Sequence, residues 1–130
     1  MAEHPNVALL RKGYEAFAKG DLDTLRGLFA DDIVWHSPGN NILSGDYKGH
    51  EEVFGFFGRI VQETGGKFSN DIHDVLANDE HAAVMVNVHS ERNGKTLDAP
   101  AVHIFHVNDG KVTEFWAFGQ DSNELDAFWS

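Results

Sequence analysis

Three side chains in this sequence could transfer a proton, because of their residue type and their position. They are those of His103, His36 and Asp121. His103 lies within a strand-like stretch, His36 comes just before a Ser-Pro-Gly turn, and Asp121 follows the last strand-like stretch. An imidazole changes charge near neutral pH, and it can donate a hydrogen bond to an oxygen that becomes negative during a reaction. An aspartate can act as a general base where burial removes water from it. The three residues are therefore candidates for acid–base catalysis.

The position of His103 follows from a predicted hairpin. Asn93-Gly94 separates two strand-like stretches and suits a type I′ turn of two residues. This turn places His103 opposite Val84, and side chains alternate between the two faces of a strand. His103 then shares its face with apolar side chains only, which are Val84, Val86, Val88, Ala99, Ala101 and Phe105. A lone histidine on such a face either lines a pocket or is a core residue with one hydrogen bond.

The other two candidates each have a structural interpretation as well. His36 belongs to the short strand-like run Ile33–Ser37, in which alternation puts Trp35 and Ser37 on one face and His36 on the other. His36 can therefore be a histidine at a strand edge, unless a bulge turns it toward the pocket. Asp121 can equally be the N-cap of a short C-terminal helix.

A metal site and a bound cofactor are not expected. His103 and His106 form an H-x-x-H pattern, but residues three apart on a strand point to opposite faces and cannot share one ion. The chain contains no cysteine, which excludes thiolate ligands, disulfides and a cysteine nucleophile. Acid–base chemistry by protein side chains alone is the reaction type that these residues favour.

The overall charge excludes some partners. The formal net charge is −11, from 21 acidic and 10 basic residues, and such a surface repels the phosphate backbone of nucleic acids. The longest apolar stretches are far shorter than the ~18–20 residues of a membrane span. The N-terminal segment lacks the basic start and continuous apolar centre of a signal peptide. We therefore expect a cytoplasmic protein with a small-molecule partner, bound neither to nucleic acid nor to a membrane.

The patterns of apolar residues predict one α+β domain over residues 1–130. Apolar residues recur with helical spacing over 6–19, 22–29 and 50–64, with Gly65-Gly66 ending the third helix. Strand-like stretches follow at 67–77, 80–92, 95–107 and 111–120, separated by turn signals. The glycine-rich segment 37–49 is predicted to be a loop over the mouth of a pocket. Helices followed by an antiparallel meander predict helices packed on one face of a sheet.

The last strand-like stretch, "KVTEFWAFG", is apolar on both faces. Phe115 and Ala117 lie on one face, and Trp116 and Phe118 on the other. A strand in a domain of two layers needs one apolar face only, so the second face indicates a further buried surface. The pattern predicts a homodimer formed through the sheet.

Three segments resemble a known family. "GYEAFAKGDLDTLRGLFADDIVWHSPG", "GDYKGHEEVFGFF" and "GKVTEFWAFGQD" are similar to SnoaL-like and ketosteroid-isomerase-like proteins of the nuclear transport factor fold, in the same order along nearly the whole chain. The resemblance implies a cone-shaped barrel, in which three N-terminal helices pack on a curved, mainly antiparallel sheet and enclose a hydrophobic pocket. It also implies frequent homodimers. In the polyketide-cyclase branch, it implies a histidine and an aspartate in the cavity as an acid–base pair.

The residues that a steroid isomerase of this fold uses are not kept. Its aspartate base matches Ser37, its tyrosine donor matches Gly13 with Tyr14 adjacent, and its protonated aspartate donor matches His103. That mechanism is therefore not expected. The Asp-Arg-Asp set of the epoxide hydrolases of this fold is also not found.

Together, these observations predict an enzyme of the isomerase, cyclase or lyase type that works without a cofactor on a hydrophobic carbonyl or polycyclic compound. His103 would stabilise charge, and Asp121 or His36 would move the proton. The predicted pocket residues are Tyr14, Trp35, Ser37, Phe54, Phe57, Phe105, Trp116 and Phe118. A non-catalytic ligand-binding or dimerisation module is the alternative, and an epoxide hydrolase-like enzyme is a second one.

Overall fold

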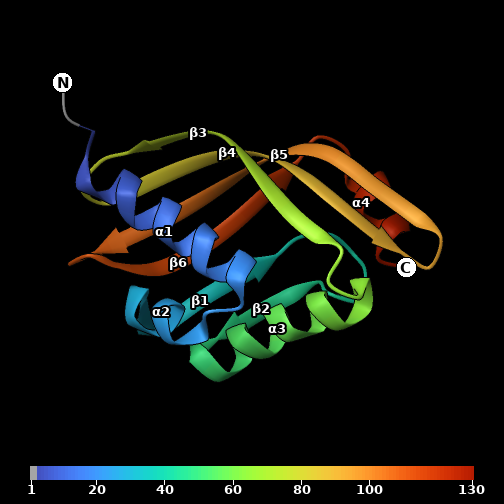
Figure 1. The fold of residues 1–130 in the computed structure, drawn as a ribbon, viewed down its shortest axis with the longest axis horizontal. Coiled ribbons are helices and arrows are strands. Elements are labelled where there is room, and N and C mark those ends of the chain that lie inside the picture. The colour runs from blue at the N-terminus through green and yellow to red at the C-terminus, as the bar shows by residue number, and fades with distance from the viewer. Residues whose placement is uncertain (1–2) are drawn as a thin grey trace.

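The computed structural model describes residues 3–130, which form helices and one six-stranded sheet (Figure 1). The helices are α1 (Pro5–Lys19), α2 (Leu22–Leu28), α3 (Gly49–Thr64) and α4 (Ser122–Phe128). The strands are β1 (Phe29–Ser37), β2 (Gly45–Lys48), β3 (Phe68–Ala77), β4 (His81–Arg92), β5 (Lys95–Asn108) and β6 (Lys111–Gly119). The predicted α+β class is confirmed.

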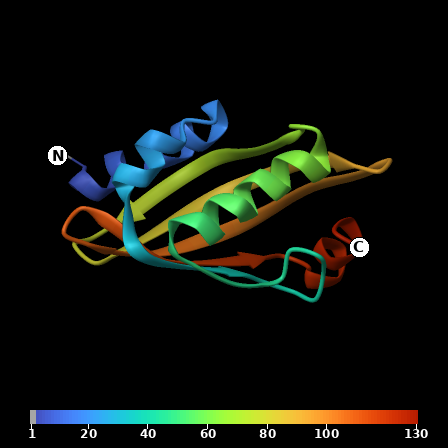
Figure 2. The ribbon, with the colours of Figure 1, turned by 90° about the horizontal axis from the view of Figure 1, so that it is seen from below.

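The sheet has the strand order β2-β1-β6-β5-β4-β3 and is strongly curved. Strand β1 runs parallel to β6, and all other neighbouring pairs are antiparallel. Figure 2 shows α1 and α3 lying along the same side of this sheet, with α4 near the C-terminus at one end of it. The helices thus face the inner side of a curved sheet, as the predicted cone-shaped arrangement requires.

The hairpin of β4 and β5 has the predicted register. His103 pairs with Val84, and Ala101 pairs with Val86. Asn93 and Gly94 have φ angles of 51° and 76°, so both turn residues adopt the positive φ of a type I′ turn. His103 therefore lies on the helix-covered face, as the alternation of the strand predicts.

The segment 37–49 differs from the prediction, because its second part is a strand and not a loop. Strand β2 pairs antiparallel with β1 and places Tyr47 opposite Trp35. The strand is only four residues long and mostly exposed, so it has no run of alternating apolar residues. The pattern of apolar residues in the sequence therefore could not identify this strand.

The hydrophobic core fills the space between the inner sheet face and the helices. Ile33 on β1, Val53 on α3 and Val84 on β4 are fully buried. The Trp35 and Phe115 rings stack with their centroids 3.7 Å apart, which joins β1 to β6. Burying each such aromatic or aliphatic side chain stabilises the fold by about 1.5–3 kcal/mol.

Among residues 3–130, the helices lack the length and apolar character that crossing a bilayer requires.

Candidate active site

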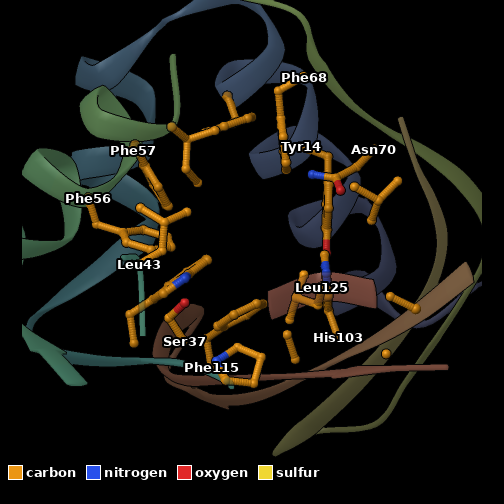
Figure 3. A pocket seen from close by; sticks show the side chains of 18 of the residues that line it. Tyr14, Ser37, Leu43, Phe56, Phe57, Phe68, Asn70, His103, Phe115 and Leu125 are labelled. Atoms are coloured by element: carbon orange, nitrogen blue, oxygen red, sulfur yellow. The ribbon is translucent and has the colours of Figure 1, made fainter. Parts of the chain in front are cut away.

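A largely apolar cavity lies between the inner sheet face and the helices, and its volume is about 190 Å³ (Figure 3). This is below the range of about 300–1,000 Å³ typical for drug-sized ligands, and somewhat above the ~150 Å³ of an engineered cavity that holds benzene. The cavity therefore suits a molecule of one or two rings. Its aromatic walls come from α1, α3 and the sheet, and they include Tyr14, Phe17, Trp35, Phe56, Phe57, Phe68, Phe105 and Phe115.

The central polar feature of the cavity wall is a pair formed by Tyr14 on α1 and His103 on β5. The Tyr14 hydroxyl lies 2.5 Å from Nδ1 of His103, and the planes of the two rings are within 7° of parallel. Figure 3 shows both side chains meeting end to end at the edge of the open space. Phe105 and Phe115 contact the pair edge-on, so apolar rings hold both side chains in place.

Burial keeps both members of this pair neutral. It lowers the pKa of His103 to about 4 and raises the pKa of Tyr14 well above its ordinary value. A phenol is a better donor than a neutral imidazole N–H, and an unprotonated imidazole nitrogen is a better acceptor than a phenol oxygen. Tyr14 therefore donates to Nδ1, and the single imidazole proton of His103 lies on Nε2.

Nε2 of His103 is the atom that can act on a bound molecule. Within the part of the chain that the structure describes, it makes no hydrogen bond. An N–H group held in an apolar cavity binds an oxygen more strongly as that oxygen gains negative charge. Because its pKa is about 4, the same histidine is a poor proton acceptor at neutral pH. The geometry therefore supports a role as a hydrogen-bond donor to a carbonyl or phenolic oxygen.

Asp121 lies at the mouth of this cavity and caps α4. Its Oδ1 accepts hydrogen bonds from the backbone N–H groups of Asn123, at 2.9 Å, and Glu124, at 3.3 Å. The N-cap interpretation is therefore confirmed. Both bonds use the same oxygen, which leaves Oδ2 available to a ligand at the mouth.

The mouth is fixed by contacts between α4 and the segment before β2. Asp126 on α4 accepts hydrogen bonds from the backbone N–H of Asn40 and from Nδ2 of Asn41, both at 2.8 Å. Arg92 donates to the backbone carbonyl groups of Phe128 and Ser130 at the end of α4. These contacts hold Asp121 in a defined position beside the cavity.

His36 lies outside the cavity, on the outer face of the sheet. Its Nδ1 bonds Asp46 at 2.6 Å and its Nε2 bonds Glu114 at 2.7 Å, and its ring stacks on Trp116. The hydrogen bond to Glu114 is the main cause of the raised pKa of His36. Its neighbours Trp35 and Ser37 line the cavity, as the alternation predicts, so the sheet separates His36 from the cavity.

The predicted pocket residues divide in the same way. Tyr14, Phe57 and Phe105 line the cavity together with Trp35 and Ser37. Three other predicted pocket residues do not line it. Phe54 packs against Phe29 and under the Arg26 guanidinium, while Trp116 and Phe118 project from the outer face of β6.

Two features of the site were not predicted from the sequence, namely the hydrogen bond between Tyr14 and His103 and the presence of Asn70 in the cavity wall. The resemblance matched the tyrosine donor position to Gly13, but the structure brings the adjacent Tyr14 to His103. Asn70 also lines the cavity, from the inner face of β3. Its signal was available, because Phe68, Asn70 and Ile72 alternate on one face and the middle residue is polar.

In residues 3–130, no group of three or more histidine, aspartate and glutamate side chains is arranged to hold a metal ion. The titratable side chains along the cavity wall are Tyr14, His103, Asp121 and Glu124.

Comparison with known proteins gives a family for this architecture. A model of the SnoaL-like domain matches residues 10–115. An uncharacterised protein of Mycobacterium tuberculosis is 29% identical over the full length of both chains. The structure of Bal32a, from a soil-derived mobile gene cassette, is 36% identical, with a TM-score of 0.92 over 96% of each chain.

More distant structures share the fold alone. IdmH from Streptomyces antibioticus, a proposed polyketide cyclase, is 21% identical, with a TM-score of 0.75 over 94% of this chain and 96% of that one. TerC, crystallised with polyporic acid, is 19% identical, with a TM-score of 0.84 over 96% and 98% of the two chains. A nuclear-transport-factor-2-like protein of Burkholderia pseudomallei is 22% identical, with a TM-score of 0.85 over 96% and 97%.

Proposed function

Because the chain belongs to the SnoaL-like domain family, we propose that it is an enzyme that binds a compact hydrophobic carbonyl or phenolic compound and activates its oxygen without a cofactor. The observation that carries this proposal is the neutral Tyr14–His103 pair on the wall of an apolar cavity. The cavity supplies binding by its aromatic walls, and the pair supplies the polar group that orients the ligand.

His103 would act by hydrogen bonding to the substrate oxygen. When a proton leaves the carbon beside a carbonyl, the electron pair of the C–H bond moves to the carbonyl oxygen and forms an enolate. The Nε2–H of His103 would stabilise this negative charge while the imidazole itself stays neutral. Removing one such donor from an enzyme typically lowers the rate by about 10²–10³-fold.

Asp121 would accept the proton that leaves the carbon. Its free Oδ2 lies at the mouth, where a substrate that reaches out of the small cavity would meet it. Return of the proton from Asp121 to another carbon completes an isomerisation. Attack of the enolate carbon on a second carbonyl, whose oxygen then takes the proton from Asp121, completes a cyclisation. IdmH and TerC support such a ligand by likeness of fold.

A non-catalytic binding module is the second candidate. It is favoured by Ser37, which stands where the resemblance to steroid isomerases calls for an aspartate base. It is also favoured by the exposure of Asp121, since a solvated carboxylate is a weak base. An epoxide hydrolase-like activity has less support, because no arginine belongs to the cavity wall in residues 3–130.

The two candidates are separated by proton exchange on a small ketone. We expect the protein to bind 1-tetralone, measured by quenching of tryptophan fluorescence, and to speed exchange of its α-protons in D₂O, measured by NMR. Asp121→Asn keeps a good N-cap and removes the base, so exchange should fall by at least ~10²-fold while the melting temperature stays the same. Binding without exchange in the wild type would establish the module instead.

We also propose that two copies pair through the outer face of the sheet. The side chain of Phe118 is 59% exposed there, and Trp116, Ile104 and Val102 beside it are only half-buried. A second copy placing the same patch against this one would cover these side chains. Light scattering should give the mass of two chains for the wild type and of one chain for Phe118→Asp. A wild-type mass of one chain would contradict the dimer.

A further inference from the structure

Asn70 occupies an unusual place for a polar side chain. It projects from the inner face of β3 between Phe68 and Ile72, and its neighbour across the sheet is Val88 on β4. All of these neighbours are apolar and belong to or pack against the core. An amide in such surroundings is unfavourable unless it forms hydrogen bonds.

The Asn70 amide has no such bonds within residues 3–130. Its Oδ1 is buried without any hydrogen-bond partner. Three buried polar side chains are satisfied, by contrast: Asn6 donates to the carbonyl of Asn78, Thr64 donates to that of Ile60, and Ser90 donates to that of Lys67. Leaving one buried acceptor unpaired costs about 1–3 kcal/mol of stability. Asn70 thus differs from these three polar side chains in having an unpaired buried oxygen.

The direction of the side chain indicates that the amide can contact a ligand in the cavity. Asn70 lines the same cavity as the Tyr14–His103 pair, and Figure 3 shows its amide nitrogen turned toward the open space. Inside this cavity the aromatic and aliphatic walls offer a ligand no hydrogen bonds. His103 and Asn70 are two separate polar points on this mainly apolar wall, which also carries the polar side chains of Ser37, Asn41, Gln120, Asp121 and Glu124.

We propose that Asn70 is a second recognition residue, whose side-chain amide forms a hydrogen bond with a hydroxyl or amino group of the ligand. The substrate class is then a one- or two-ring compound with two polar functions: a carbonyl or phenolic oxygen at His103, and a hydroxyl or amino group at Asn70. This inference rests on the proposed function, because that function places the acceptor oxygen at His103. A hydroxyl suits the amide well, since it can donate to Oδ1 and accept from Nδ2.

The test compares 1-tetralone with its 5-, 6- and 7-hydroxy derivatives, with dissociation constants measured by isothermal titration calorimetry. The wild type should bind at least one hydroxy derivative about tenfold more tightly than 1-tetralone. Asn70→Leu, which is similar in size and apolar, should remove this preference and keep the affinity for 1-tetralone. It should also raise the melting temperature, because an unpaired buried amide is removed.

Two further variants make the outcome specific. Asn87→Leu changes an exposed asparagine on the neighbouring strand β4 and should keep the preference for the hydroxy derivative. His103→Phe should raise the dissociation constants of 1-tetralone and of its hydroxy derivatives by the same factor.

Each contrary result has a definite meaning. If 1-tetralone binds through His103 but no hydroxy derivative is preferred, or if the preference survives Asn70→Leu, the role of Asn70 is overturned and the proposed function stands. If none of the tetralones binds to the wild type, the proposed function fails and the inference fails with it.

Discussion

The two faces of the sheet carry two histidines with opposite properties. His103 on the inner face is buried against apolar rings and has one neutral partner, so its pKa falls to about 4. His36 on the outer face lies between two carboxylates, so its pKa rises above its ordinary value. The same side chain is therefore a neutral hydrogen-bond donor in one place and tends to be a cation in the other. Its surroundings, and not its residue type, decide what chemistry it can do.

The largest difference is expected in activity. His103→Gln should lower the rate of α-proton exchange on 1-tetralone by about 10²–10³-fold, because the donor to the developing enolate is misplaced. His36→Gln should change the rate by less than about twofold, since the sheet separates it from the cavity. NMR exchange rates of both variants at equal protein concentration check the comparison. Equal losses in both would show that the two faces do not differ in function.

The next difference is in the dependence of stability on pH. As pH falls from about 6.5 to about 4, the unfolded state gains a proton at His103 that the folded state does not, so His103 lowers stability in acid by about 3 kcal/mol. His103→Leu should therefore lose less stability than the wild type over this window.

His36 should behave in the opposite sense. Because its folded pKa is raised, it stabilises the fold below pH about 6.5, and this contribution disappears as pH rises through the folded pKa. His36→Gln should thus be less stable than the wild type at pH 5.5 and equal to it at pH 8.5. Urea unfolding at several pH values measures both effects. Parallel pH profiles of His36→Gln and the wild type would contradict the assignment.

The smallest expected effect concerns the inner face alone and tests whether Tyr14 positions His103. Tyr14→Phe removes the hydroxyl that orients His103 and keeps the ring, so activity should fall by about tenfold and less than for His103→Gln. The unfolding free energy should change by only about 1 kcal/mol. An undiminished exchange rate in Tyr14→Phe would show that the hydroxyl does not position the imidazole.

The structure also shows why some positions could be predicted and others could not. The faces of β4 and β5 followed from one turn, because a strand repeats every two residues and Asn93-Gly94 fixes the register. The helix faces did not follow in this way. Neighbouring residues on a helix point about 100° apart. Phe56 rather than Phe54 reaches the cavity, and Tyr14 rather than Gly13 meets His103, only through the rotation that tertiary packing imposes.

Asn70 shows a third kind of limit. Alternation on β3 is interrupted by a register shift between Ile72 and Asp74, so the pattern read along the whole strand obscures which residues face inward. The local alternation of Phe68, Asn70 and Ile72 was a signal for Asn70, and the pairing of β3 with β4 settles that these residues share the inner face. Its unpaired oxygen could not be inferred from the sequence at all, because hydrogen bonds between distant segments depend on the folded geometry.

The most direct test of the central claim is ¹⁵N NMR of the histidine side chains as a function of pH, with the His103 signals assigned by their absence in His103→Leu. At pH 7, Nε2 of His103 should carry the proton and Nδ1 should not, and protonation should occur only near pH 4. The signals of His36 should show an imidazolium that persists to higher pH than a free histidine. Titration of His103 near pH 6.5, or a proton on its Nδ1 at pH 7, would contradict the account of a neutral donor aimed at the ligand.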